Sequence, residues 1–322
     1  MTLIQKAEVD NQTVITKFIL LGFGDLPQLQ TLLFLLFLVI YIASMAGNIL
    51  IIALVVADQH LHTPMYFFLG NLSCMETWYS STILPRMLAS LLTGDRYISV
   101  CGCVMQFYCF GFLACTECYL LAAMSCDRYL AICKPLHYAA LMNGRTWVLA
   151  AGSWLWAFVA STITVYLMSQ LTFCGPSEID LFFCDLNPLI KHSCHDTNLI
   201  TLLSFIVTSI GVPFPFLLTV ASYSFIITTI LRIPSTTRKK KAFSTCSSHL
   251  MVVTIFYGTI ITVCILPDTD TLRDLNKVFS VFYTVLTPLV NPLIYSLRNK
   301  EVKLALRKII HKLMVPTGIQ KE

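Results

Sequence analysis

The stretch Met124–Cys133 reads MSCDRYLAIC and ends a long apolar run that begins near Cys103. Asp127 and Arg128 place two full charges in this apolar helix, which is costly unless the charges reach water or each other. At about 1.5 Å per residue, a helix from Cys103 to Arg128 spans roughly 37 Å, so its ends lie near opposite faces of a lipid bilayer. Glu117 returns to nearly the same helix face about three turns deeper. One helix face therefore combines a buried acid with an arginine at the membrane boundary.

The composition is that of a membrane protein. Hydrophobic residues make up 56% and charged residues only 12% of the 322 residues, whereas soluble proteins have about 25% charged residues. Charge-poor runs of about 20 residues predict seven membrane-spanning helices, at residues 31–57, 64–92, 99–133, 146–172, 199–231, 242–267 and 278–297. The expected fold class is an all-α membrane protein. A seven-transmembrane helix bundle covers residues 27–297, after a tail of residues 1–26, and a short amphipathic C-terminal helix and tail cover residues 298–322.

The positive charges orient this bundle. The side that holds Arg128 carries 15 of the 22 Lys and Arg residues, so this side is predicted to be cytoplasmic and the N-terminus extracellular. The basic excess therefore indicates topology and disfavours a nucleic-acid partner for the run Arg238–Lys241. The apolar run Phe18–Phe23 is too short for a cleavable signal peptide, so the first spanning helix is expected to act as its own insertion signal.

Two patterns near the chain ends predict surface features. Asn11-Gln12-Thr13 is a glycosylation sequon in the predicted extracellular tail, with Asn11 as the acceptor. After Leu297, basic residues alternate with apolar ones, which predicts an amphipathic helix lying on the lipid of the inner leaflet.

Polar residues deep in the predicted helices favour a shared cluster, because such residues normally face a partner or a water-filled cavity. The cluster would contain Asn48, Glu76, Glu117 and Asn291. Two interpretations remain open. One or both glutamates are protonated and hydrogen-bonded, or a sodium ion lies between Glu76 and Glu117. No other cofactor is expected.

The predicted outer side is rich in cysteine. Cys103 ends the third helix there, and the long loop of residues 171–198 carries Cys174, Cys184 and Cys194. Disulfides persist on the oxidising side of the membrane, and four cysteines allow three pairings. Cys101 is a fifth candidate. A metal site at His192, Cys194 and His195 is a less favoured alternative to a disulfide at Cys194.

Together these features resemble the rhodopsin-like G-protein-coupled receptors and, within them, the odorant receptors of the land-vertebrate class. The resemblance covers nearly the whole chain. It rests on residues 61–69 (LHTPMYFFL), Met124–Cys133, Ser222-Tyr223, residues 241–249 (KAFSTCSSH), Phe256-Tyr257-Gly258 and residues 288–295 (PLVNPLIY). The chain departs from the family pattern at Cys126, where tyrosine is usual, and at Glu76, where aspartate is common. Neither change removes a charge.

The resemblance implies the disulfide pairing, the location and the partners. The pairs would be Cys103 with Cys184 and Cys174 with Cys194. The protein would be a multi-pass plasma-membrane receptor, not an enzyme, and would activate the stimulatory, olfactory-type heterotrimeric G protein and raise cyclic AMP. Its ligands would be airborne and hydrophobic odorants.

The outer halves of the third, fifth, sixth and seventh helices are the predicted walls of a ligand pocket. The candidate ligand-binding residues are Phe107, Phe110, Gly111, Ala114, Cys115, Val207, Thr208, Gly211, Tyr257, Ile260, Ile261, Cys264, Val281 and Thr284. An unpaired buried ion costs several kcal/mol, and none of these side chains is charged at neutral pH, so a small neutral ligand is expected. Thr208, Tyr257 and Thr284 are the expected hydrogen-bonding groups.

The predicted mechanism is a shift between two packings of the bundle. At rest, Arg128 is expected to be held by Asp127 and by polar groups near Thr245 and His249. Ligand binding would move the sixth helix outward and open a cavity for the G protein. The expected coupling and activation residues are Asp127, Arg128, Tyr129, Tyr223, Thr245, His249, Asn291, Pro292 and Tyr295.

Other functions fit the sequence less well. A transporter or channel would be expected to show internal repeats, and an enzyme would need a catalytic constellation at an accessible face; neither is apparent. A receptor for an amine would be expected to carry an acid near Phe110, and this chain has none there. A rhodopsin-like receptor for another ligand class and a chemosensor outside the nose remain the alternatives.

Overall fold

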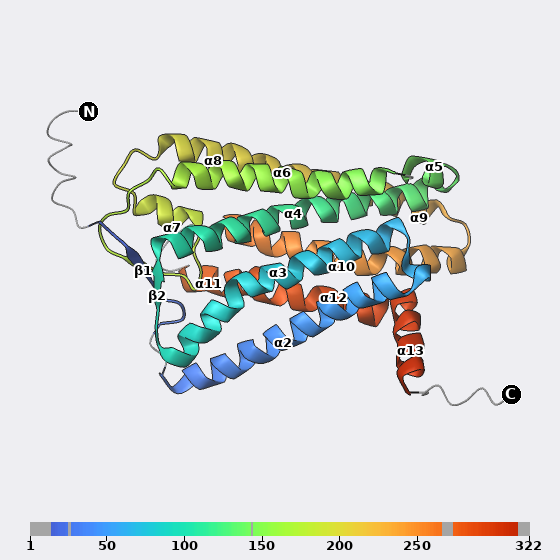
Figure 1. Cartoon of the computed structure of the whole chain (residues 1–322). Coiled ribbons are helices and arrows are strands. Elements are labelled where there is room, and N and C mark those ends of the chain that lie inside the picture. Colours follow the sequence, from blue (N-terminus) through green and yellow to red (C-terminus); the bar gives the residue numbers. More distant parts are fainter. Residues whose placement is uncertain (1–13, 25–26, 143, 266–272, 315–322) are drawn as a thin grey trace. The chain divides into compact units, whose positions relative to one another are not determined.

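The computed structural model describes residues 14–24, 27–142, 144–265 and 273–314, and the chain is mostly helical (Figure 1). The long helices are α2 (Pro27–Ala57), α3 (Pro64–Thr93), α4 (Val100–Cys133), α6 (Arg145–Met168), α8 (Asn198–Gly211), α9 (Pro213–Arg232) and α10 (Thr236–Ile265). The last spanning segment combines α11 (Arg273–Val281), the π-helical turn η4 (Phe282–Leu286) and α12 (Thr287–Arg298), and α13 (Lys300–Met314) follows it. Asn11 lies outside the described residues, so its glycosylation remains a prediction.

Membrane-spanning length and apolarity are met by five segments of the described chain: Gln28–Ala57, Val100–Cys133, Arg145–Met168, Asn198–Arg232 and Lys277–Ser296. The two bent parts of α10 count as a sixth when they are taken as one span. α3 is a 30-residue helix at the place of the second predicted span, although Glu76 and Arg86 interrupt its apolar sequence. The chain thus has the expected helical membrane fold, with helix bounds close to those predicted.

The fifth and sixth helices differ from the predicted ranges, as does the seventh, which begins at Arg273 and contains the π-helical turn η4. The fifth span is divided into α8 and α9 at Val212, immediately before Pro213, whose nitrogen carries no hydrogen for an intrahelical bond. The sixth helix begins at Thr236 instead of residue 242, so the basic run Arg238–Lys241 is helical and belongs to the first turns of α10.

The contacts divide the chain into two compact units. Unit 1 contains Met1–Tyr41, Trp78–Tyr119 and Gly152–Pro215, and unit 2 contains Ile42–Thr77, Leu120–Ala151 and Phe216–Glu322.

Unit 1 contains a small sheet that the sequence did not predict. Its order is β2 (Tyr97–Ser99), β1 (Lys17–Leu20), β3 (Glu178–Ile179), with β1 antiparallel to β2 and parallel to β3. Phe18 and Leu20 alternate with exposed or half-buried neighbours along β1 and are buried, as expected for a strand with one covered face. The ring of Phe18 meets that of Phe173 edge to face, with centroids 5.5 Å apart. The tail is therefore held to the loop after α6. The short helix α7 (Leu186–Lys191) follows in the same loop.

Unit 2 includes the short segments η1 (Gln59–Leu61), η2 (Pro135–His137) and α5 (Tyr138–Met142). Its helices α2 and α12 approach closely, because a Cβ atom added to Gly47 would lie 3.1 Å from the Pro292 ring. Glycine at this position therefore permits the close contact of the two helices.

α13 leaves the end of α12 at a steep angle (Figure 1). Asn299 makes the corner, since its Oδ1 accepts hydrogen bonds from the backbone N–H groups of Glu301 and Val302. Val302 and Ala305 are buried while Lys303 and Arg307 are exposed, so the predicted amphipathic helix is present. The Lys308 ammonium lies 3.3 Å from Asp58.

Asp58 is a fixed negative charge beside α13. The backbone N–H and then the imidazole of His60 lower the pKa of Asp58 to about 2, because hydrogen bonds favour the charged carboxylate. Asp58 is therefore ionised at physiological pH and available to Lys308.

Candidate functional site

Asp127 and Arg128 form a buried ion pair near the end of α4. The guanidinium of Arg128 donates two hydrogen bonds to Asp127 Oδ2, from Nη2 at 2.7 Å and from Nε at 3.1 Å. The Asp127 side chain is fully buried and the Arg128 side chain is only 13% exposed. Removing one partner of such a pair leaves an uncompensated buried charge. The pair is thus stable as a unit and costly to separate.

Tyr138 is a third member of this site that the sequence reasoning missed. Its hydroxyl donates a 2.7 Å hydrogen bond to the other carboxylate oxygen, Asp127 Oδ1. Burial and this contact with the carboxylate raise the pKa of Tyr138 above the ordinary tyrosine range, so the phenol remains a donor. Both oxygens of Asp127 are therefore occupied. The helical spacing within α4 could not reveal Tyr138, because it follows the turn at Pro135 and lies on the next helix, α5.

His249 has a different partner from the one predicted. In the described residues, the side chain of Arg128 makes its hydrogen bonds to Asp127, while the His249 imidazole Nδ1 and the Tyr223 hydroxyl lie 2.7 Å apart. The two rings are stacked, with centroids 5.8 Å apart. This bond joins α9 to α10. The side chain of Thr245 lies outside what the structure describes.

Apolar contacts join α4, α9 and α10 near this bond. Tyr223, Ile226, Ile230 and Cys246 form a buried cluster against which Tyr129 and Ile132 of α4 pack. The ring of Tyr129 lies 5.8 Å from that of Phe225. The predicted activation residues Tyr129, Tyr223 and His249 are thus brought together in unit 2.

The break that Pro292 makes in α12 is bridged from α2. Pro292 has no N–H, so the carbonyl of Pro288, four residues earlier, lacks its usual helical donor. Asn48 Nδ2 and Ser44 Oγ each donate a 3.0 Å hydrogen bond to this carbonyl. Asn291 Nδ2 in turn donates to the carboxylate of Glu76 on α3. Tyr295 is buried on the same helix, α12.

Of the predicted polar cluster, Glu76 and Asn291 are in contact in unit 2, and Asn48 binds the same helix as Asn291, at the Pro288 carbonyl. The Oδ1 atoms of Asn48 and Asn291 are buried and have no hydrogen-bond partner within the described chain. Such oxygens are suitable ligands for a hard cation, so the donor set fits sodium. Glu117 belongs to unit 1, where it is buried and its Oε1 lacks a described hydrogen-bond partner. Among the described residues there is no group of three or more His, Cys, Asp or Glu side chains that could hold a metal ion.

Two disulfides hold the loop after α6 in unit 1. They join Cys103 to Cys184 and Cys174 to Cys194, which is the pairing that the resemblance implied. Cys101 is a free thiol. Because Cys194 is in a disulfide, it is not available as a metal ligand, and the alternative metal site at His192, Cys194 and His195 is wrong.

The side chain of Gln106 fastens the loop to α4 and was missed by the sequence reasoning. It accepts a 3.0 Å hydrogen bond from the Cys184 N–H and donates a 3.3 Å bond to the Thr82 carbonyl. Phe110, one turn further along α4, lies between Tyr79 and Phe183, with ring centroids 5.3 and 5.2 Å away. The loop therefore reaches one of the predicted ligand-binding residues.

The ligand-binding residues predicted in unit 1 lie on α4 and α8. The two helices are adjacent, because the Tyr119 hydroxyl donates a 3.2 Å hydrogen bond to the Ile210 carbonyl, and a Cβ added to Gly211 would lie 3.6 Å from Cys115 Sγ. A Cβ added to Gly111 would meet nothing within 4 Å. Phe107 packs against the disulfide-linked core. The remaining members, Ala114 and Val207, are half-buried.

The buried face of α8 differs from the one expected. Thr208, a predicted hydrogen-bonding group, is exposed, whereas Ser204 is buried and its Oγ has no hydrogen-bond partner in the described residues. Ile200, Ser204 and Gly211 share this face. The spacing of the small residues Ser204 and Gly211, seven positions apart, was the signal that could have identified Ser204.

The ligand-binding residues predicted in unit 2 lie on α10 and before α12. Tyr257 is buried between Phe216 and Phe256, with ring centroids 5.0 and 5.2 Å away. Thr284 is buried and donates a 2.6 Å hydrogen bond to the Ser280 carbonyl. Ile260, Ile261 and Val281 are half-buried. The side chain of Cys264 lies outside the described residues.

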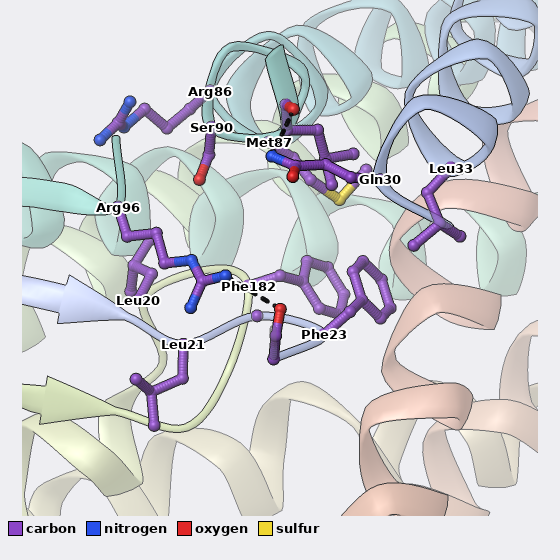
Figure 2. A pocket seen from close by; sticks show the side chains of 13 residues that line it. Leu20, Leu21, Phe23, Gln30, Leu33, Arg86, Met87, Ser90, Arg96 and Phe182 are labelled. Carbon is purple, nitrogen blue, oxygen red and sulfur yellow. Dashed lines mark hydrogen bonds between the residues drawn. The ribbon is translucent and has the colours of Figure 1, made fainter. Parts of the chain in front are cut away.

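A small cavity of about 50 Å³ lies in unit 1 between residues 20–24, the start of α2 and the end of α3 (Figure 2). The stacked rings of Phe23 and Phe182, with centroids 5.6 Å apart, form one wall. The Arg96 guanidinium donates a 2.9 Å hydrogen bond to the Gly24 carbonyl, and Gln30 Nε2 donates a 2.8 Å bond to the Leu91 carbonyl. The first bond joins the segment before α2 to the segment after α3, and the second joins the start of α2 to the end of α3. No sequence pattern predicted this cavity.

Comparison with known proteins identifies the family. The family model described as olfactory receptor matches residues 37–313. Olfactory receptor 6B1 of Homo sapiens is 48% identical, with 94% of this chain and 97% of the relative covered. Olfactory receptor 11A1 of Homo sapiens is 48% identical, with 93% and 95% covered. Olfactory receptor 5B21 of Mus musculus is 46% identical, with 94% and 96% covered. The chain is therefore a multi-pass membrane protein that belongs to the olfactory receptor family of G-protein-coupled receptors.

Proposed function

We propose that this receptor binds small, neutral, hydrophobic odorants within its helices and activates the stimulatory, olfactory-type G protein, which raises cyclic AMP. The observation that supports it best is the buried pair of Asp127 and Arg128, capped by Tyr138. Because the Arg128 guanidinium is enclosed in this packing, a change in helix packing can expose it to the G protein. The predicted orientation follows from the basic residues, with Arg128 at the cytoplasmic side of the plasma membrane and the N-terminus outside.

The ligand class follows from the proposed lining. Its residues are apolar or neutral, so an amine or carboxylate would lose its hydration without gaining a counter-charge. Tyr257 and Thr284 are buried hydroxyl residues, and Ser204 takes the place of Thr208 as the proposed hydrogen-bonding group on α8. A ligand of about ten heavy atoms gains roughly 5 to 8 kcal/mol, which corresponds to micromolar affinity.

The proposed mechanism uses two contacts of unit 2. At rest, the Tyr223–His249 bond holds α9 to α10, and the carboxylate of Asp127 holds Arg128. Ligand contact near Tyr257, about two turns from His249 on α10, favours the packing in which these helices separate. Arg128, Tyr223 and Tyr295 then become available to the G protein. The ligand shifts the equilibrium only by its differential affinity for the two packings.

A sodium ion is proposed as a structural ion of the resting packing. Asn48, Glu76 and Asn291 would hold it in unit 2, and Glu117 is a further candidate carboxylate. The ion would supply positive charge that compensates buried carboxylate. In detergent, sodium should raise the unfolding temperature of the wild type. An unchanged sodium dependence in Glu76→Gln and Glu117→Gln would remove the ion from the mechanism.

The test is a cyclic AMP screen of neutral volatiles on cells that express the chain. Arg128→Ala should abolish the response to every agonist when the response is divided by surface receptor, which corrects for any loss of folded protein caused by the unpaired charge of Asp127. Arg145→Ala is the matched control, because Arg145 is an exposed arginine at the start of α6 in the same unit. A full response from Arg128→Ala would contradict the coupling mechanism. A response to charged ligands alone would contradict the proposed ligand class.

A further inference from the structure

A groove of about 790 Å³ runs between the end of α9 and the part of α10 from Lys239 to Ile255. Its volume lies in the range of about 300 to 1,000 Å³ that is typical of sites for small organic ligands. The lining residues all belong to unit 2. They are Ile230, Leu231, Lys239, Lys240, Phe243, Ser244, Ser247, Leu250, Met251, Thr254 and Ile255.

One part of the groove is apolar and open. Leu231 is 64% exposed, Phe243 53% and Met251 37%. Contiguous apolar surface of this kind marks a binding site or a membrane contact. Buried residues of α10 such as Cys246, His249 and Val253 lie on its other face. The exposed part of the groove is therefore on the opposite side of α10, although Ile230, which also lines the groove, belongs to the buried cluster of unit 2. In a spanning helix this exposed side would face lipid.

The other part of the groove is basic. Lys239 and Lys240 line it from the first turns of α10, and that helix has no acidic residue in its first turn. Within the described residues, no carboxylate forms an ion pair with either lysine. The helix N-terminus adds a partial positive charge. Ser244 and Ser247 line the same groove, next to the lysines.

We propose that this groove binds one anionic phospholipid, with the phosphate group at Lys239 and Lys240 and an acyl chain along Leu231, Phe243 and Met251. The proposal rests on charge complementarity. Basic residues directly beside an open apolar groove match an anionic head joined to a hydrocarbon chain. A soluble anion would use only the lysines and would leave the apolar groove unfilled. The phospholipid would contact α9 and α10 together.

The full-length receptor, purified in detergent, is titrated with phosphatidylserine and with phosphatidylcholine of identical acyl chains, and bound lipids are counted by native mass spectrometry. Wild type should bind one phosphatidylserine in preference to phosphatidylcholine. A lysine beside an anionic head strengthens binding about five-fold, so Lys239→Gln with Lys240→Gln should weaken phosphatidylserine binding by about 25-fold. Glutamine keeps much of the side-chain length and removes only the charge.

Two further variants distinguish binding in this groove from attraction of the anionic lipid to any basic surface of the receptor. Lys303→Gln with Arg307→Gln removes the same number of exposed charges from α13 and should leave the bound phosphatidylserine in place. Met251→Trp keeps both lysines but narrows the groove, and should weaken phosphatidylserine binding several-fold. The unfolding temperature of each variant without added lipid confirms that it is folded.

Three results would overturn the proposal. The first is equal binding of the two lipids by wild type. The second is an equal loss of phosphatidylserine in the α10 and α13 variants, which would show attraction by charge alone. The third is unchanged lipid binding by the α10 variant together with lost G-protein activation, which would identify the groove as a surface for a protein.

Discussion

At the scale of single residues, Asp127 is the centre of the proposed resting state. One of its oxygens binds Arg128 and the other accepts the Tyr138 hydroxyl. A hydrogen bond to a charged group contributes about 1.5 to 3 kcal/mol when it is buried. Tyr138 therefore stabilises the carboxylate in the position that holds Arg128.

Tyr138→Phe should raise basal cyclic AMP several-fold in cells without odorant, because the resting position of Asp127 loses a donor. The measurement is basal cyclic AMP divided by surface receptor. Tyr119→Phe is the control, since it removes another tyrosine hydroxyl bond, to Ile210, away from the ion pair. Equal basal signals from Tyr138→Phe and wild type would show that Tyr138 has no part in the resting state.

The buried hydroxyl of Ser204 belongs to the same scale. For an odorant with an oxygen atom, Ser204→Ala should raise the half-maximal concentration by about five-fold, the value of one neutral hydrogen bond of about 1 kcal/mol. Thr208→Val should have a smaller effect, because Thr208 is exposed. Dose-response curves for both variants decide between these residues. A larger effect at Thr208 would restore the assignment made from sequence.

At the scale of elements, α12 depends on α2 for one of its backbone bonds. The Pro288 carbonyl has no donor at Pro292 and is served by Asn48 and Ser44 instead. A side-chain bond is easier to exchange than a bond in the helical ladder, so this is where α12 can change its bend. α4 has no such break, because it is one continuous helix from Val100 to Cys133.

Asn48→Ala should lower the unfolding free energy by about 1 to 3 kcal/mol, because it removes a donor from a buried carbonyl. In a Pro292→Ala background the cost should be smaller, since an alanine in place of the proline restores the backbone N–H. Thermal unfolding of the wild type, the two single variants and the double variant measures this coupling. Additive effects of the two substitutions would contradict the assigned role of Asn48.

At the scale of the whole molecule, the spans were predictable because a lipid-exposed chain must satisfy its backbone hydrogen bonds within helices. Charge-poor runs therefore gave bounds close to those of α3 and α4. The strand β1 was too short for a periodic signal, and its partners lie far away in sequence. The exposed position of Thr208 was not foreseen, because the spacing of Ser204 and Gly211, which marks the buried face of α8, was not used. Tyr138 had no such signal, because it follows the turn at Pro135 and has no helical spacing to Asp127.

In the proposed mechanism, agonist binding uncovers Arg128, which Asp127 holds at rest. The direct measurement is chemical modification of arginine by phenylglyoxal in the purified receptor, with and without agonist, read by peptide mass spectrometry. Modification of Arg128 should increase several-fold with agonist, while exposed Arg145 should be modified equally in both conditions. Equal modification of Arg128 with and without agonist would contradict the claim.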